Sequence, residues 1–170
     1  MKKQMFTGFI LVGIIIIIIF YLITNIKQPY VDCNISHTDD LGVKVTEEVT
    51  SNFNSRSISK IEVIRKIYLP EKYNTKANLN AVSYSLKRSY KYLGKDVVIN
   101  VYDDHVTMKI STTKSKPIIL DNMEFYDTNG FGINIDTNTK SSESINLTVG
   151  DKYSEGEYMV FMKNYGYSCK

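Results

Sequence analysis

Few residues of this 170-residue chain are of types that do chemistry. The two histidines, His37 and His105, each lie beside a pair of aspartates, at positions 39–40 and 103–104. An imidazole near carboxylates can hold a metal ion, but a stable site needs three or four ligands. Asp and His are also ordinary turn residues, and both stretches have the composition of turns. We therefore predict no metal ligand and no catalytic residue at either place.

Familiar enzyme motifs are missing from the sequence. There is no Gly-x-Ser-x-Gly, no His-Glu-x-x-His and no phosphate-binding loop. A nucleophile also needs a base near it, and two scattered histidines offer little choice. We expect a protein that is not an enzyme and has no cofactor. The alternative is an enzyme whose site is assembled only by the fold.

The two cysteines, Cys33 and Cys169, allow a single pairing. In a domain facing an oxidising exterior, an even number of cysteines favours a disulfide. A bridge between them would close a loop of about 136 residues and stabilise the fold by up to about 5 kcal/mol in the chain-entropy model. It would tie the C-terminal end to the start of the domain that faces this exterior. The alternative is two unrelated thiols.

A cluster of basic residues offers a possible binding surface. It consists of Lys87, Arg88, Lys91 and Lys95, on a segment without acidic residues between positions 76 and 95. Three of the lysines are four residues apart, which places them on one flank of a helix. Such a face could hold phospholipid headgroups or an anionic cell-wall polymer. The alternative is a solvated outer face whose lysine stems cover apolar surface.

Net charge argues against nucleic acid as a partner. The chain has 21 basic and 18 acidic residues, but Lys2, Lys3 and Lys27 precede the rest of the charged residues. The chain after residue 27 therefore has 18 of each sign and is formally neutral, whereas a general nucleic-acid binder has a positive surface. The abundance of Ile, Lys, Asn and Tyr is typical of an AT-rich bacterial genome.

The N-terminal segment predicts a membrane anchor. No charged residue occurs from Gln4 to Ile26, and the apolar part from Phe9 would span about 27 Å as a helix. Lys2 and Lys3 before it predict a cytoplasmic N-terminus. We expect a leader and transmembrane helix over residues 1–27 and a juxtamembrane linker over 28–40. The extracytoplasmic domain is then residues 41–170, at the cell membrane.

Two alternatives to a retained anchor are weaker. A cleaved secretory signal needs small residues after its apolar core, and "TNIKQPYVDC" does not provide them. A type IV prepilin would be cleaved between Gly8 and Phe9, but Gly13 occupies the position at which prepilins have Glu. Pro29 also ends the helix that a pilin would continue.

Alternation and helical periodicity indicate the elements of the exposed domain. "LGVKVTEEVTSNF" and "ISKIEVIRKIYL" alternate apolar residues and predict a hairpin. "NLNAVSYSLKRSYKYLGK" predicts a helix that ends at Gly94. "DVVINVYD" and "HVTMKIST" predict two strands, a second hairpin turns at Asn129-Gly130, and "INLTV" predicts another strand. Ser154 and Glu157 have capping-box spacing and start a last helix, with Gly166 just beyond its end.

The order of these elements gives the predicted fold class. It is α+β: an N-terminal transmembrane helix followed by a mainly antiparallel sheet with two helices packed on it. The apolar N-terminal segment, the hairpin and the terminal "GYSCK" resemble small extracytoplasmic domains of Gram-positive bacteria related to YehR-type lipoproteins. That resemblance implies a surface location and no assigned chemistry. Cys33 is not preceded by a lipobox, so the transmembrane helix would replace the lipid as the anchor.

The sequence therefore predicts a single-pass, membrane-anchored extracytoplasmic domain. We expect a non-enzymatic binding or structural module at the bacterial cell envelope. An envelope enzyme is the alternative from another class, and a pilin-like subunit is a further one.

Overall fold

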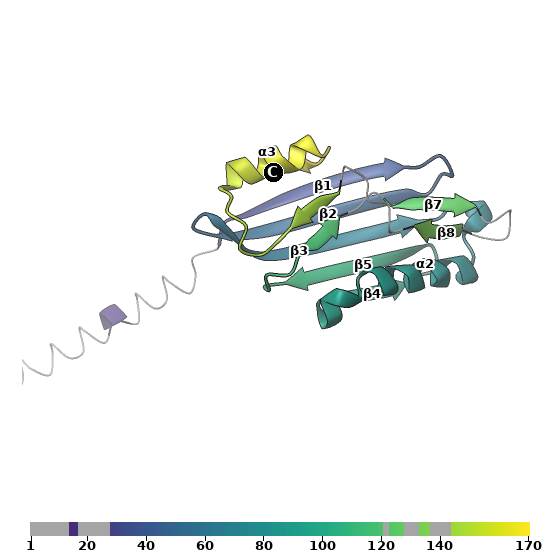
Figure 1. Ribbon diagram of the computed structural model, residues 1–170, viewed down its shortest axis with the longest axis horizontal. Helices are drawn as coiled ribbons and strands as arrows, with labels where there is room; N and C mark the ends of the chain where they lie inside the picture. Colours follow the sequence, from purple (N-terminus) through teal and green to yellow (C-terminus); the bar gives the residue numbers. More distant parts are fainter. Residues whose placement is uncertain (1–13, 17–27, 121–122, 128–132, 137–143) are drawn as a thin grey trace, which may run out of the picture.

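The computed structural model describes residues 14–16, 28–120, 123–127, 133–136 and 144–170 (Figure 1). Its centre is a six-stranded antiparallel sheet with the order β10-β1-β2-β3-β5-β4. The strands of this sheet are β1 (Tyr30–Thr38), β2 (Lys44–Asn54), β3 (Ser57–Tyr68), β4 (Val97–Val101), β5 (His105–Thr112) and β10 (Ser168–Cys169).

Helices and two short strand pairs cover one face of the large sheet. The α-helices are α2 (Lys76–Ser89) and α3 (Glu155–Asn164), and the 3₁₀ helices are η1 (Glu71–Tyr73) and η2 (Lys91–Asp96). The short pairs are β6 (Ile118–Leu120) with β9 (Ile145–Leu147), and β7 (Glu124–Asp127) with β8 (Ile133–Asp136). Figure 1 shows α3 beside β1 and α2 along the β4–β5 side. The two helices therefore lie at opposite ends of the sheet.

The hairpin of β2 and β3 forms as its sequence predicts. Val45 pairs with Ile67 and Val49 with Val63, and all four side chains are buried on the covered face. The alternate residues of β2, Thr46, Glu48 and Thr50, are partly or fully exposed on the other face. This alternation fits a sheet with one covered and one solvated side.

The segment predicted as a linker over residues 28–40 contains strand β1 instead. β1 pairs with β2 along its full length, from Tyr30 opposite Asn52 to Thr38 opposite Lys44. Its apolar residues alternate, with Val31 and Cys33 buried and the intervening positions polar. The folded domain therefore begins about ten residues earlier than the boundary at residue 41 that the sequence analysis set.

Helix α2 is shorter than predicted. Thr75 caps its start by accepting a hydrogen bond from the N–H of Asn78 at 3.2 Å, and the helix ends at Ser89. The predicted apolar stripe is buried as expected, at Leu79, Val82, Leu86, Tyr90 and Leu93. Its last two members lie beyond the α-helix, since a backbone turn at Tyr90 leads into η2. Lys91 and Lys95 therefore belong to η2, not to one continuous helical flank.

The predicted start and end of the last helix are both confirmed. Ser154 accepts a hydrogen bond from the N–H of Glu157, and the Glu157 carboxylate accepts one from the N–H of Ser154 at 2.8 Å. Gly166 has φ +86°, a left-handed conformation that closes the helix and turns the chain into β10. The second predicted hairpin is formed by β7 and β8, and its turn at Asn129-Gly130 lies outside the described residues.

The predicted fold class needs one correction, which concerns its N-terminal transmembrane helix. No helix among the described residues is long and apolar enough to span a membrane. Of the expected anchor, only residues 14–16 are described, and they are helical; the rest of residues 1–27 lies outside the described part. The mainly antiparallel sheet with two packed helices is present, so the prediction is wrong in its N-terminal element.

Candidate functional site

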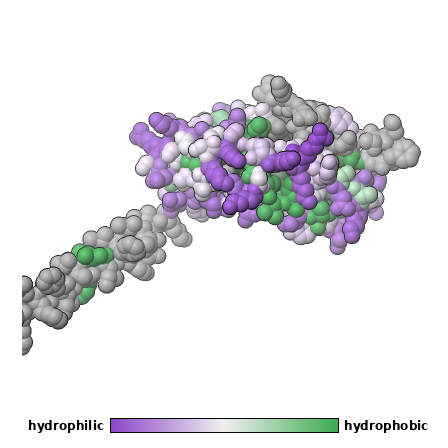
Figure 2. Space-filling model, turned by 60° about the horizontal axis from the view of Figure 1, so that its bottom comes forward, coloured by the Kyte–Doolittle hydropathy of each residue, from purple (hydrophilic) through white to green (hydrophobic). Residues whose placement is uncertain are grey.

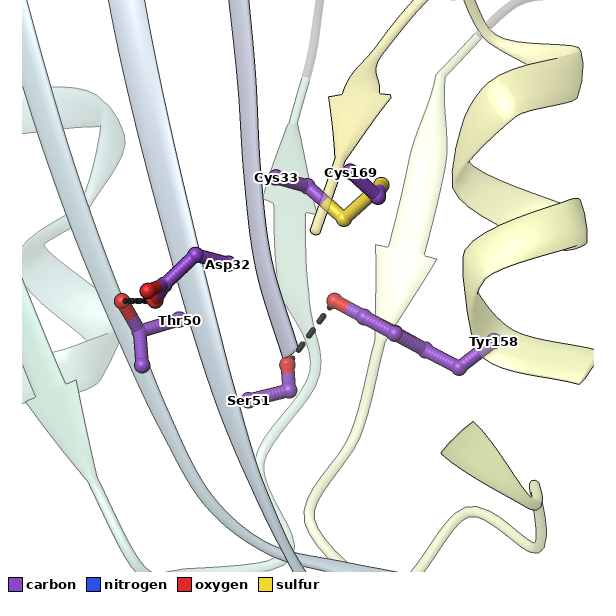
Figure 3. The surroundings of a disulfide bond; sticks show 6 residues. All are labelled: Asp32, Cys33, Thr50, Ser51, Tyr158 and Cys169. Carbon is purple, nitrogen blue, oxygen red and sulfur yellow. Dashed lines mark hydrogen bonds between the residues drawn. A yellow bond between two sulfur atoms is a disulfide. The ribbon is translucent and has the colours of Figure 1, made fainter. Parts of the chain in front are cut away.

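The disulfide joins the two ends of the described domain (Figure 3). Cys33 on β1 and Cys169 on β10 are directly opposite each other in the sheet, with Cα atoms 4.1 Å apart. Beside them the backbones of Asp32 and Lys170 exchange two hydrogen bonds, at 3.1 and 2.9 Å. The predicted pairing is confirmed, and it closes β10 onto the edge of β1.

Helix α3 is fixed to the sheet beside this disulfide. Tyr158 is fully buried, and its hydroxyl accepts a hydrogen bond from Ser51 on β2 at 2.8 Å. In Figure 3 these two side chains lie on the disulfide side of the strands, and Asp32 and Thr50 lie on the other side. Burial raises the pKa of Tyr158 to about 12, although the hydrogen bond from Ser51 opposes the shift.

We expect alkaline conditions to weaken the fold through Tyr158. Above pH 10 this phenol is ionised in the unfolded chain but still protonated in the folded chain. Because the unfolded state then binds fewer protons, the free energy of unfolding falls as the pH rises, until about pH 12. Over that window the loss from this residue is about 3 kcal/mol. Urea unfolding from pH 8.5 to 11.5 should show a shallower decline for Tyr158→Phe than for the wild type. Parallel declines would contradict the assignment.

The two histidines lie at the start of β5 and near the end of β1. His105 begins β5, its Nδ1 lies 2.6 Å from the Asp104 carboxylate, and its ring stacks between those of Tyr68 and Tyr102. His37 is half-buried on β1, and burial lowers its pKa, with the positive charge of Arg65 adding to the effect. Neither histidine belongs to a group of three potential metal ligands within the described residues.

The acidic pair beside His37 lies in a turn, and Asp39 stabilises that turn. Its Oδ1 accepts hydrogen bonds from the N–H groups of Leu41 and Val43, at 3.0 and 2.7 Å, in the turn between β1 and β2. Asp103 and Asp104 form the two-residue turn between β4 and β5, in which Tyr102 donates its N–H to the carbonyl of His105 at 2.8 Å. Both aspartate pairs therefore act as turn residues.

A buried polar network under the helices was not predicted. Glu47 on β2 and Arg65 on β3 are cross-strand partners, only 2% and 3% exposed, and form an ion pair. Tyr167 donates its hydroxyl hydrogen to the other Glu47 oxygen, and Arg65 donates to the Tyr90 hydroxyl at 3.3 Å. Tyr90 in turn donates to the carbonyl of Ile119 at 3.0 Å. The network ties the ends of both helices to the sheet.

The groups of this network shift each other's pKa values. Burial lowers the pKa of Arg65, but the charge and the hydrogen bond of Glu47, together with Tyr90 and Tyr167, outweigh burial, and the pKa lies above its ordinary value. Burial and the same carboxylate raise the pKa of Tyr167. The sequence contained a signal for the pair, because Glu47 has the inward parity of Val45 and Val49. An acid among inward-facing valines predicts a buried partner of opposite charge.

Two of the predicted basic residues line a groove between α2 and β4. One hollow of about 260 Å³ is lined by Lys87, Tyr90, Lys91, Gly94, Val97 and Ile99. A second, of about 220 Å³, is lined by Lys76, Leu79, Asn80, Val101, Tyr102 and Asp103. Both have helix residues on one side and β4 residues on the other, so together they follow the strand. We call this feature the α2–β4 groove.

The structure divides the four residues of the predicted patch. Lys87 and Lys91 line the groove, and Lys76, which was not assigned to the patch, lines its other end. Lys95 is exposed just beyond Gly94, and Arg88 is exposed without lining either hollow. The positively charged surface is therefore one side of a groove, not a flat helix face.

Apolar side chains form the other side of the groove. Val101 and Tyr102 line the second hollow and are 38% and 49% exposed, which is high for such residues in a strand and its turn. Val98, 52% exposed, lies on the opposite face of β4. Figure 2 shows apolar surface gathered on the side where β4 and α2 lie, with hydrophilic side chains around it. The groove thus combines an apolar strand with lysines along its opposite wall.

Comparisons with known proteins give no relative for this chain. No protein-family model, no curated protein and no solved structure matches it.

Proposed function

We propose that this chain is a non-enzymatic binding module that works outside the cytoplasm and holds an anionic partner in the α2–β4 groove. Three lysines line this groove, whereas Asp103 is the single acidic residue among its lining residues. The chain after residue 27 as a whole is formally neutral, so the positive potential of the groove is local. The observation that carries the proposal is this concentration of lysines beside exposed apolar surface.

The disulfide supports the proposed location. Disulfides persist in oxidising compartments and are rare in the cytosol. The bridge between Cys33 and Cys169 joins two strands that pair directly in the sheet. The same location is the one that the resemblance to extracytoplasmic lipoprotein-related domains implies.

The size of the hollows favours a binding surface over an enzyme site. Pockets for small molecules usually have about 300–1,000 Å³ and bury most of their ligand. The two hollows of the groove are smaller and lie one after the other along β4. The most strongly perturbed titratable groups, Arg65 and Tyr167, belong to the buried network instead. The groove is therefore suited to hold part of a larger, elongated partner.

The test is retention on anionic resins. The full chain, kept in solution with a neutral detergent, is passed over poly-glutamate and polyphosphate resins at about 0.05 M salt, where surface charges are weakly screened. We expect retention on at least one resin and elution as salt is raised. The variant Lys87→Glu/Lys91→Glu should pass through unretained.

A matched control separates local charge from net charge. Lys44→Glu/Lys152→Glu makes the same change in net charge at two exposed positions away from the groove. This control should be retained like the wild type. The proposal fails if the wild type binds neither resin, or if both double variants lose retention equally.

A further inference from the structure

Strand β4 is the last strand at one edge of the large sheet. Among the described residues it pairs with β5 alone. Its sequence, Val97–Val101, contains no charged residue and no proline. Natural proteins usually protect such edges with lysines, prolines or bulges within the strand, because an open edge recruits other strands. An edge that is open and apolar in this way is a template on which a strand of another chain can pair.

The backbone of β4 has hydrogen-bonding groups directed away from β5. Tyr102 and His105 form a hydrogen-bonded pair at the turn, and antiparallel pairs alternate between bonded and non-bonded. Val98 and Asn100 therefore bond to β5, and Val97, Ile99 and Val101 direct their groups outward. The N–H of Val97 is used by the carbonyl of Gly94. Ile99 and Val101 donate to no backbone carbonyl within the described part of the chain.

The groove and the open edge lie on the same element. The hollows are lined by Val97, Ile99 and Val101, the same alternate residues whose backbone groups point outward. An added strand would thus bond to β4 and place every second side chain toward the hollows and α2. Peptide-binding domains that extend a sheet use this combination of main-chain bonds and pockets for alternate side chains.

We propose that the partner in the α2–β4 groove is an extended acidic polypeptide segment, which adds to the sheet as a strand beside β4. This proposal rests on the function proposed above and names the class of partner. Acidic side chains at alternate positions would meet Lys76, Lys87 and Lys91 across the groove. Apolar side chains at the other positions would lie beside the exposed Val98 on the open face.

A second copy of the chain fits the edge less well. Pairing two β4 strands about a two-fold axis would bring the two α2 helices together on the same face of a joined sheet. The lysines of both grooves would then face each other with like charge, which opposes association. The charge of the groove therefore favours an acidic segment over self-association.

The probe is a seven-residue peptide that alternates Val and Glu, with acetylated and amidated ends. We expect it to bind the full chain, and Lys87→Glu/Lys91→Glu to weaken binding at least tenfold. Two further peptides have N-methyl groups on either the Val or the Glu amides. Because a strand bonds to its neighbour through alternate residues, one methylated peptide should lose at least tenfold in affinity and the other should retain it.

A variant of β4 tests the same claim from the protein side. Ile99→Pro removes an N–H that points away from β5, a position where proline is tolerated in an edge strand. It should leave the chain folded, as judged by circular dichroism and the unfolding midpoint, and abolish binding of the peptide. If this variant does not fold, the two methylated peptides still decide the question on the wild-type chain.

The outcomes separate this proposal from the one it rests on. Equal binding of both methylated peptides, with loss in Lys87→Glu/Lys91→Glu, would overturn strand addition and leave the anionic groove standing. Absence of peptide binding with intact retention on the anionic resins would do the same. Dimerisation that Ile99→Pro abolishes would show that a second copy is the occupant, and would overturn the acidic segment.

Discussion

Replacement of Arg65 by methionine is expected to lower the free energy of unfolding by about 3–5 kcal/mol. Arg65 and Glu47 form an ion pair that is almost completely buried, as the exposed fractions of 3% and 2% show. The substitution leaves the Glu47 carboxylate in the core without its cation. An unpaired buried charge costs far more than the loss of an exposed ion pair, which is worth about 0–1 kcal/mol. Urea unfolding at pH 7 measures the difference directly.

The double variant Glu47→Met/Arg65→Met is the control for this effect. It removes both charges together and fills the space with apolar side chains, a change that is often neutral or stabilising for a buried pair. We expect it to recover most of the loss caused by Arg65→Met. Some loss should remain because the hydroxyl of Tyr167 also depends on Glu47. A loss below about 1 kcal/mol in Arg65→Met would mean that the pair behaves as if exposed.

Reduction of the disulfide is expected to destabilise the fold by about 2–5 kcal/mol. The bond between Cys33 and Cys169 closes a loop with a sequence separation of 136. Opening it lets the unfolded chain sample many more conformations, and it also frees the two-residue strand β10 from β1. Urea unfolding with and without a reducing agent should show a lower midpoint for the reduced chain.

The variant Cys33→Ala/Cys169→Ala controls for effects of the reductant. It should unfold at the midpoint of the reduced wild type, or slightly below it because Cys33 is buried. Its unfolding midpoint should not change when reductant is added. Equal stability of oxidised and reduced wild type would show that β10 is held by other contacts, such as the two backbone bonds of Asp32 with Lys170.

Local patterns predicted the elements that depend on neighbouring residues. The alternation of Val45 and Val49 predicted β2, and the capping box of Ser154 and Glu157 predicted α3. The stripe from Leu79 to Leu93 predicted the buried residues of α2 correctly, although it overestimated the length of the helix. Burial follows the apolar pattern, whereas the end of a helix depends on a single backbone turn.

Elements that depend on distant partners were harder to predict. β1 was assigned to a linker because its polar residues and its position near the expected anchor hid the alternation of Val31 and Cys33. The order of strands places β3 next to β5, and this leaves β4 at the edge. No local pattern contains that order. The sequence pattern therefore identified the lysines of the groove, and it did not identify the strand that forms the other wall.

The most direct test of an oxidised binding module outside the cytoplasm is thiol labelling of intact cells that express the chain. A membrane-impermeant maleimide is applied with and without prior reduction, and the mass of the protein is measured. We expect both Cys33 and Cys169 to be labelled after reduction and neither before it. Labelling of both cysteines without reduction, or labelling that occurs only in lysed cells, would contradict the proposed location and with it the proposed function.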